Sequence, residues 1–284
     1  MAMKLTVLEG NHLALDGGAM FGNAPKELWK RWITPDALNR ISLASRALLI
    51  QANGKNILLE TGSGAFFEPK LRDRYQIAAA NQILTNLNEI GLAEEDIHAV
   101  ILSHLHFDHA GGLLTAYEEN KPLQLLFPNA SYYVSKIHWE YALHPHIREA
   151  SSFIPELFPL LKASNRLTLI EHDMRPFLEL GLTFHISHGH TKGLMLTKIE
   201  LPDGPLLFAS DLVPGEAWLQ LPIAMGYDRF PELLIDEKTH HLSQLAKERG
   251  VILFCHDPNI ALGRVALHPH SGKFSATVLA SIKC

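Results

Sequence analysis

Residues 103–112 read SHLHFDHAGG and contain the pattern H-x-H-x-D-H. The apolar run that precedes it, residues 98–103, indicates a strand, while residues 110–118 look helical. The polar segment is therefore expected on a loop between a strand and a helix. Four groups that can bind metal within six residues are costly unless something pairs them. The pattern predicts a metal site rather than four solvated loop residues.

The spacing inside the pattern divides its side chains between two ions. His104 and His106, two positions apart just past a strand end, can turn to one metal, and Asp108 and His109 on the next turn can face a second. Taken singly, each of three later residues is more readily a loop residue or a satisfied core group. Taken with the first pattern, in this order, they would complete two metal sites. Each of the three follows a predicted strand: His190, Asp211 and His256.

Strands and helices are predicted to alternate along both halves of the chain. The strand over residues 45–51 is followed by Asn53-Gly54, a hairpin signal, and residues 75–90 have the apolar spacing of a helix. This order favours the α+β class, an αββα four-layer sandwich of two mixed sheets flanked by helices. A parallel barrel would need eight evenly spaced βα units. No repeat or linker marks a boundary, so residues 1–284 are expected to form a single domain.

The composition is that of an ordinary globular protein, with 47% hydrophobic and 19% charged residues in 284. The formal net charge of −5 argues against a nucleic-acid partner. Two cysteines are too few for a disulfide framework and suit a reducing compartment, and the sequence starts without a basic and apolar leader, so a cytoplasmic location is expected. No stretch reaches the roughly 18 apolar residues of a membrane span, so no membrane partner is expected.

The seven candidate ligands, in this order, resemble those of the metallo-β-lactamase superfamily, and the resemblance spans nearly the whole chain. It implies the αββα fold with a hydrolytic site for two divalent metal ions. Two ions about 3.5–4 Å apart lower the pKa of a bridging water and polarise the scissile oxygen, so hydrolysis needs no protein nucleophile. Zinc is expected first, with manganese, iron or cobalt as alternatives. The resemblance places His104, His106 and His190 on the first ion, Asp108, His109 and His256 on the second, and Asp211 between them.

Four other segments resemble the YtnP-type quorum-quenching lactonases of this superfamily. The resemblance implies the opening of a lactone ring, that of an N-acyl homoserine lactone, through attack by a hydroxide that bridges the metals. Glu60 departs from the family pattern, which usually has Asp there, without removing a ligand. The segments are DGGAMFG at residues 16–22, FPNA at 127–130, YVS at 133–135 and GYD at 226–228.

Apolar residues outside the predicted core strands are candidates for contact with the substrate. In this fold their segments rise around the metal edge, where an apolar lip could receive an acyl chain. The same side chains would equally form a homodimer contact or a satellite core cluster, and the sequence leaves these alternatives open. The candidates are Met20, Phe21, Trp29, Trp218 and Met225.

Two residues are candidates for catalytic roles beside the metals. Asp108, a ligand, can receive a proton and pass it to the leaving alkoxide. By analogy with related lactonases, Tyr227 would assist at the substrate carbonyl, with a hydrogen-bonded loop anchor as the alternative. His240 and His241, on an amphipathic helix predicted from about residue 232 to 249, are expected on a solvated face.

These observations favour a dinuclear metal-dependent hydrolase whose partner is a small molecule, a lactone with an acyl chain. Two alternatives use the same dinuclear site: a phosphodiester or organophosphate hydrolase, and a thioester hydrolase. A non-catalytic metal-binding protein would be expected to lack ligands. None of the seven is missing.

Overall fold

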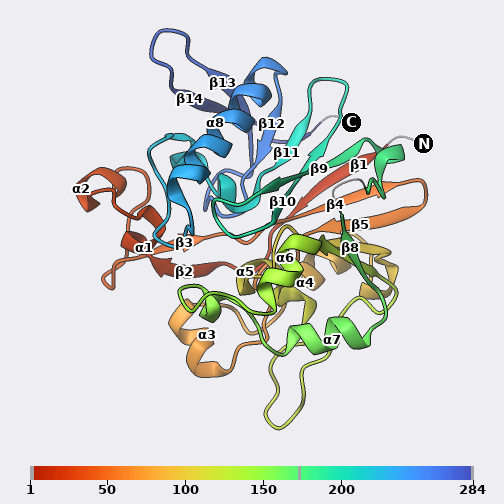
Figure 1. The fold of residues 1–284 in the computed structure, drawn as a ribbon. Helices are drawn as coiled ribbons and strands as arrows, with labels where there is room; N and C mark the ends of the chain where they lie inside the picture. Colours follow the sequence, from red (N-terminus) through yellow and green to blue (C-terminus); the bar gives the residue numbers. More distant parts are fainter. Residues whose placement is uncertain (1–2, 172–173, 283–284) are drawn as a thin grey trace. The chain divides into compact units, whose positions relative to one another are not determined.

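The computed structural model describes residues 3–171 and 174–282, and the chain divides into two compact units (Figure 1). Each unit contains one six-stranded sheet. The expectation of a single domain over residues 1–284 stays a prediction. Unit 1 comprises Met1–Leu13 with Ala44–Met174, and unit 2 comprises Ala14–Leu43 with Arg175–Cys284.

The sheet of unit 1 is mixed, with the strand order β1-β4-β5-β6-β7-β8. Its first three strands pair antiparallel, and β5 to β8 run parallel. Asn53 and Gly54, both with positive φ, form the turn between β4 and β5, so the predicted hairpin is confirmed. Because the carboxyl ends of parallel strands meet at one edge, the loops after β5, β6 and β7 collect there. The strands are β1 (Lys4–Leu8), β4 (Ala47–Ala52), β5 (Lys55–Leu59), β6 (Ala99–Ile101), β7 (Ser131–Ser135) and β8 (Leu167–Ile170).

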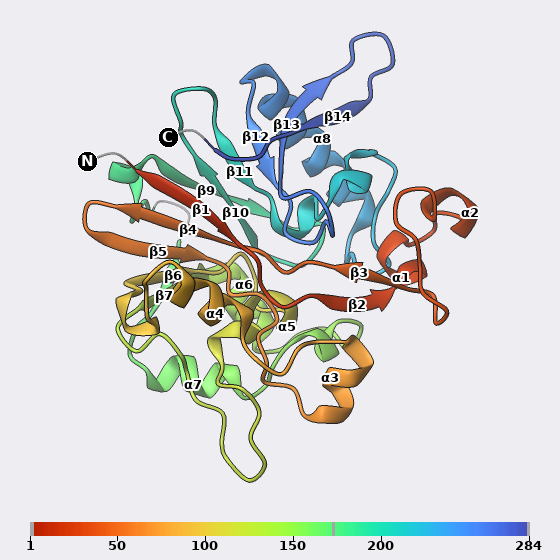
Figure 2. The same cartoon turned by 180° about the vertical axis from the view of Figure 1, so that it is seen from behind.

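Helices cover the unit 1 sheet and share its apolar core (Figure 2). The helix predicted over residues 75–90 is confirmed only over Gln82–Glu89, because Gln76, in a left-handed conformation, ends the preceding helix at Tyr75 and the Asn81 side chain caps the next one. The helix predicted over residues 110–118 is wrong beyond a single 3₁₀ turn, since Leu114 is already extended. The helices are α3 (Pro69–Tyr75), α4 (Gln82–Glu89), α5 (Phe107–Ala110), α6 (Lys136–Ala142) and α7 (Leu157–Ala163), and the 3₁₀ turns are η1 (Glu94–Asp96), η2 (Gly111–Leu113) and η3 (Ala150–Ser152).

The sheet of unit 2 is also mixed, with the order β14-β13-β12-β11-β10-β9. Only β11 and β12 run parallel, and every other neighbouring pair is antiparallel. Polar loops follow β9, β11 and β12, and these loops hold the three later candidate ligands. The strands are β9 (Leu182–Ser187), β10 (Leu194–Ile199), β11 (Leu206–Phe208), β12 (Val251–Leu253), β13 (Leu262–Leu267) and β14 (Phe274–Val278).

The long helix α8 (Pro231–Lys247) packs against the unit 2 sheet and confirms the helix predicted from about residue 232 to 249. Pro231 occupies its first turn, where the missing N–H costs nothing. No helix in residues 3–171 and 174–282 is both long and apolar enough to cross a membrane. The remaining elements are β2 (Leu13–Asp16), β3 (Arg40–Leu43), α1 (Gly17–Phe21), α2 (Lys26–Trp29), η4 (Leu178–Leu180), η5 (Ser210–Leu212) and η6 (Glu216–Leu219).

Candidate metal centre

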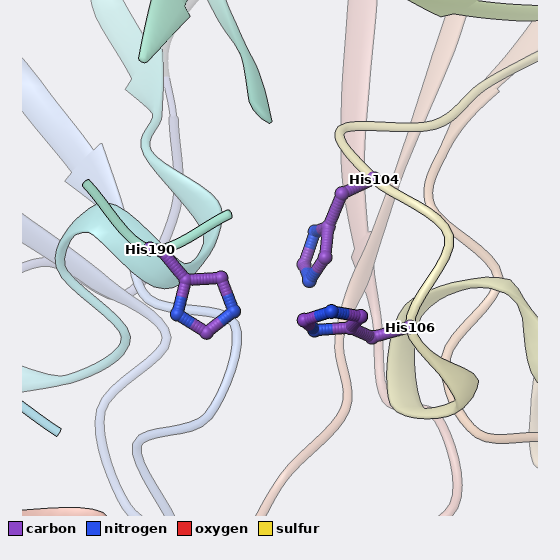
Figure 3. Close-up of side chains that lie close together, drawn as sticks. All are labelled: His104, His106 and His190. Carbon is purple, nitrogen blue, oxygen red and sulfur yellow. The ribbon is translucent and has the colours of Figure 1, made fainter. Parts of the chain in front are cut away.

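The H-x-H-x-D-H segment lies after β6 and turns directly into α5. His106 is the residue before the helix, and Asp108 lies in its first turn. The His104 ring centroid lies 4.5 Å from that of His106 and 4.1 Å from that of His109. Figure 3 shows the rings of His104 and His106 gathered beside one another. Unit 1 therefore brings the predicted ligands of this segment together, and all four are buried.

Each histidine of this segment turns one ring nitrogen to a protein group. Nδ1 of His104 lies 2.9 Å from the Ser103 hydroxyl. A buried carboxylate stands behind each of the other two: Glu149 Oε2 is 3.5 Å from Nε2 of His106, and Glu60 Oε2 is 3.3 Å from Nδ1 of His109. The hydrogen bond of Nδ1 leaves Nε2 of His104 as the nitrogen that a metal would use, and the two carboxylates place negative charge beside the rings of His106 and His109.

Unit 2 brings together the three later candidates, each from a loop that follows a strand. Asp211, on η5 after β11, directs one carboxylate oxygen to each histidine. Its Oδ2 lies 3.2 Å from Nε2 of His190, and its Oδ1 lies 3.1 Å from Nε2 of His256. The thiol of Cys255 also donates to Oδ1 of Asp211 at 3.6 Å. Each oxygen of this carboxylate therefore faces a different imidazole, and the bridging role of Asp211 stays a prediction.

The donor set fits divalent metal ions on chemical grounds. Imidazole and carboxylate suit zinc, manganese, iron and cobalt. Buried carboxylates stand in both units, with Glu60, Asp108 and Glu149 in unit 1 and Asp211 and Asp228 in unit 2. Burying carboxylates is costly unless cations neutralise them, and bound divalent ions would supply that charge.

Comparison with known proteins places the chain in a family. Residues 42–256 match the model of the metallo-beta-lactamase superfamily. The chain belongs to this superfamily. Its fold is shared with a probable metal-dependent hydrolase from Staphylococcus aureus, at 26% identity and a TM-score of 0.85, over 99% of this chain and 98% of the other. The chain described here is therefore a metal-dependent hydrolase. The predicted metallo-β-lactamase fold of the α+β class is confirmed.

Proteins similar to this chain include lactonases. N-acyl homoserine lactonase AiiB of Agrobacterium fabrum is 26% identical over 288 residues, 90% of this chain and 94% of the relative. N-acyl homoserine lactonase AiiA of Bacillus thuringiensis subsp. kurstaki is 25% identical over 239 residues, 79% of this chain and 85% of the relative. AidC, a dizinc quorum-quenching lactonase, has the same fold at 23% identity, with a TM-score of 0.77 over 99% of this chain and 96% of AidC.

Asp228 holds the imidazole of His190 from behind. Its Oδ1 lies 2.8 Å from Nδ1 of His190, and its Oδ2 accepts the Met225 N–H at 2.6 Å. Burial raises the pKa of the Asp228 carboxyl, and the contact with His190 opposes this shift. Tyr227, the predicted carbonyl donor, lies beside Asp228 and is 39% exposed. The catalytic role of Tyr227 stays a prediction.

Helix α8 contacts the segments around the unit 2 ligands through two consecutive residues. The Glu237 carboxylate accepts the Ser187 hydroxyl and the backbone N–H groups of residues 188 and 189, directly before His190. Lys238 is fully buried, and its Nζ donates to three backbone carbonyls in residues 218–223. Burial lowers the pKa of Lys238 to about 8. Gly189 permits the close approach of the helix, since a Cβ there would lie 2.4 Å from Cα of Leu234.

The residues predicted as an apolar lip lie inside unit 2. Phe21 stacks between two indoles, 5.3 Å from Trp29 and 4.7 Å from Trp218. The Trp218 Nε1–H donates to the carbonyl of Met20 at 3.1 Å. These four side chains and Met225 are at most 4% exposed, which is the burial of a core cluster. Their contact with substrate stays a prediction.

Sequence reasoning did not find the groups that hold the ligands. Glu149 and Glu237 belong to no motif, and Lys238 reads as one more charged residue of an amphipathic helix. In the sequence, Glu60 is only a departure from the family pattern, but its Oε2 lies 3.3 Å from Nδ1 of His109. Hydrophobic periodicity does not show whether a single charged residue is buried or exposed, so no sequence pattern identifies these residues as supports of the ligands.

We expect the substitution Asp228→Asn to weaken metal binding by about 10- to 100-fold, because the neutral amide loses the charge that supports the His190 imidazole. Competition with a chromophoric chelator would measure the dissociation constant. Asp236→Asn, an exposed change on α8, is the matched control and should bind metal as the wild type does. Equal affinity in both variants would contradict the role assigned to Asp228.

Proposed function

We propose that the two groups of ligands hold a pair of divalent ions, zinc in the first instance. The match to the superfamily spans both groups, and the position of Asp211 between two imidazoles supports its role as the bridge. The proposed sets are His104, His106 and His190 for the first ion and Asp108, His109 and His256 for the second.

The proposed reaction is the opening of an N-acyl homoserine lactone. The observation that carries it is a cavity of about 660 Å³ in unit 1, within the range of about 300–1,000 Å³ that is typical of ligand sites. Two lining residues are neighbours of His106: Phe107 follows it in the chain, and the Phe153 ring lies 4.8 Å from its ring. Its lining is largely apolar and aromatic and includes Phe67, Leu71, Tyr75, Phe107, Tyr117 and Phe153.

The chemistry of this cavity suits an acyl chain. Phe107 packs against Tyr75 and Phe67, with ring centroids 5.2 Å apart in both pairs. Aromatic walls exclude water and gain free energy when they cover methylene groups. With the chain in the cavity, the polar lactone would lie toward His106. The N-acyl homoserine lactonases AiiA and AiiB among the relatives support the same substrate class.

Two metal ions would supply a nucleophile at neutral pH by lowering the pKa of a water, and they would polarise the ester carbonyl. The nucleophile adds to the carbonyl carbon, the ring C–O bond breaks, and the released alkoxide takes a proton to give the N-acyl homoserine. Asp108, buried in the first turn of α5, is the proposed carrier of that proton. Tyr227, a 39% exposed residue, is proposed to donate its phenol hydroxyl to the carbonyl oxygen.

The decisive test is the initial rate of ring opening with zinc-loaded protein. N-decanoyl homoserine lactone should be opened rapidly, and γ-butyrolactone, which has no acyl chain, much more slowly. A bis(4-nitrophenyl) phosphate diester and an acyl thioester represent the alternative hydrolases. Faster turnover of either one than of the lactone would overturn the proposed substrate and leave the superfamily assignment intact.

We expect Phe67→Ala to raise KM for N-decanoyl homoserine lactone by about tenfold, since about 1–2 kcal/mol of apolar contact with the chain is lost. The rate with γ-butyrolactone should not change. Phe184→Ala, in β9 of unit 2, is the matched control, because Phe184 does not line the cavity. An equal change in KM for both lactones would show that the cavity does not hold the acyl chain.

We also propose a cytoplasmic location. Cys255 is buried and takes part in no disulfide among the described residues. A reducing compartment keeps such a thiol intact.

A further inference from the structure

We propose that His138 is a positioning residue that fixes the backbone of the H-x-H segment from behind. The backbone N–H of Leu105, the residue between His104 and His106, donates to Nε2 of His138 at 2.9 Å. Neither Leu105 nor His138 is exposed to solvent at all. A buried backbone N–H outside regular structure needs an acceptor, and here an imidazole from a different element supplies it.

His138 is itself held in place at the start of α6. The Ser135 hydroxyl, which caps this helix, accepts the His138 N–H at 3.4 Å. The His138 ring stands edge to face with His104, with centroids 5.9 Å apart, and lies 5.9 Å from the Phe153 ring. Phe153 in turn contacts His106. The imidazole is therefore locked behind both ligand histidines of the segment.

The backbone around His104 is anchored on both sides by side chains. Before it, the Ser103 N–H donates to Oε1 of Glu60 at 2.7 Å. After it, the Leu105 N–H donates to His138. The strand β6 ends at Ile101. Beyond the strand, these two side-chain hydrogen bonds fix the backbone in place of the hydrogen bonds of the sheet. A rotation of the Leu105 peptide would displace the Cα atoms of both ligands, and metal sites tolerate little displacement.

The identity of the acceptor fixes the tautomer. Because Nε2 accepts, His138 carries its ring proton on Nδ1. A glutamine presents a carbonyl oxygen on a side chain of similar reach and can replace the acceptor, whereas leucine and methionine fill the space without one. This difference separates the proposed role from simple packing.

The test compares His138→Leu, His138→Met and His138→Gln in the metal-loaded protein. We expect the two apolar variants to bind zinc about 10- to 100-fold more weakly, to change the visible spectrum of the cobalt-substituted protein, and to lower kcat with little change in KM. His138→Gln should recover affinity and spectrum to within about threefold of the wild type. His144→Leu, an exposed change just after the same helix, is the control.

A folded apolar variant with wild-type affinity and spectrum would overturn the proposal, and so would a glutamine variant as poor as leucine. Should the apolar variants not fold, nuclear magnetic resonance of the ¹⁵N-labelled, zinc-loaded wild type decides. A coupling between the Leu105 amide nitrogen and Nε2 of His138, across their hydrogen bond, is expected, and its absence would contradict the contact. The inference rests on the proposed ligand role of His104 and His106, and failure of the wild type to bind metal would refute that role separately.

Discussion

Replacing Asp211 with alanine should remove one of the two bound metal equivalents or slow turnover by at least about a hundredfold. The reason is geometric, because one Asp211 oxygen lies 3.2 Å from Nε2 of His190 and the other 3.1 Å from Nε2 of His256. No other carboxylate described in unit 2 faces both imidazoles in this way. Elemental analysis of the dialysed protein would count the metal, and the initial rate of lactone opening would measure turnover.

Asp203→Ala provides the control for this experiment, since Asp203 is exposed in the turn between β10 and β11. It removes an identical side chain from the same unit and should leave both readouts unchanged. An Asp211→Ala protein that retains two metal equivalents and full activity would show that the residue does not bridge. Loss of metal without loss of rate would limit Asp211 to a structural contribution.

Acid should destabilise the protein through His241, by up to about 3 kcal/mol. Burial, with smaller effects from His185 and His240, lowers the pKa of His241 from 6.5 to about 4. Between these values the unfolded chain binds a proton that the folded protein does not, so stability is lost as the pH falls from about 6.5 to about 4. Both His240 and His241 were expected to face solvent. The prediction is confirmed for His240, which is exposed, but it is wrong for His241, which is partly buried against His185 on β9.

The measurement is urea unfolding at pH 7.5 and at pH 4.5 for wild type, His241→Gln and His240→Gln. His241→Gln should lose about 2–3 kcal/mol less on acidification than the wild type, since glutamine does not titrate. His240→Gln should behave as the wild type. The charged groups around the pair are common to all three proteins, notably Lys198, which forms ion pairs with Glu200 and Glu248. Equal losses in all three proteins would rule out His241 as the acid-sensitive group.

The sequence by itself was enough to predict the superfamily, the fold class and the candidate ligands. This was possible because the H-x-H-x-D-H spacing is local: four side chains in six residues can reach common ions whatever packs around them. The later ligands each follow a strand, and strand ends are predictable from short-range patterns. Helix boundaries were less accurate, because the apolar periodicity from residue 75 runs through Gln76, which ends one helix, and Asn81, which caps the next.

Only the tertiary structure decided which residues hold those ligands and which form a cavity. Glu149, Asp228 and His138 lie far along the chain from the groups that they contact. Asp228 belongs to the GYD segment that resembles the family, but nothing in that segment assigns it to His190, and Glu149 and His138 belong to none of the quoted motifs. The aromatic residues show the same limit: Phe21, Trp29 and Trp218 stack into a core, whereas Phe107 and Tyr75 line a cavity. The physical reason is that hydrophobicity and charge are properties of a residue, whereas burial and contact depend on how distant elements pack.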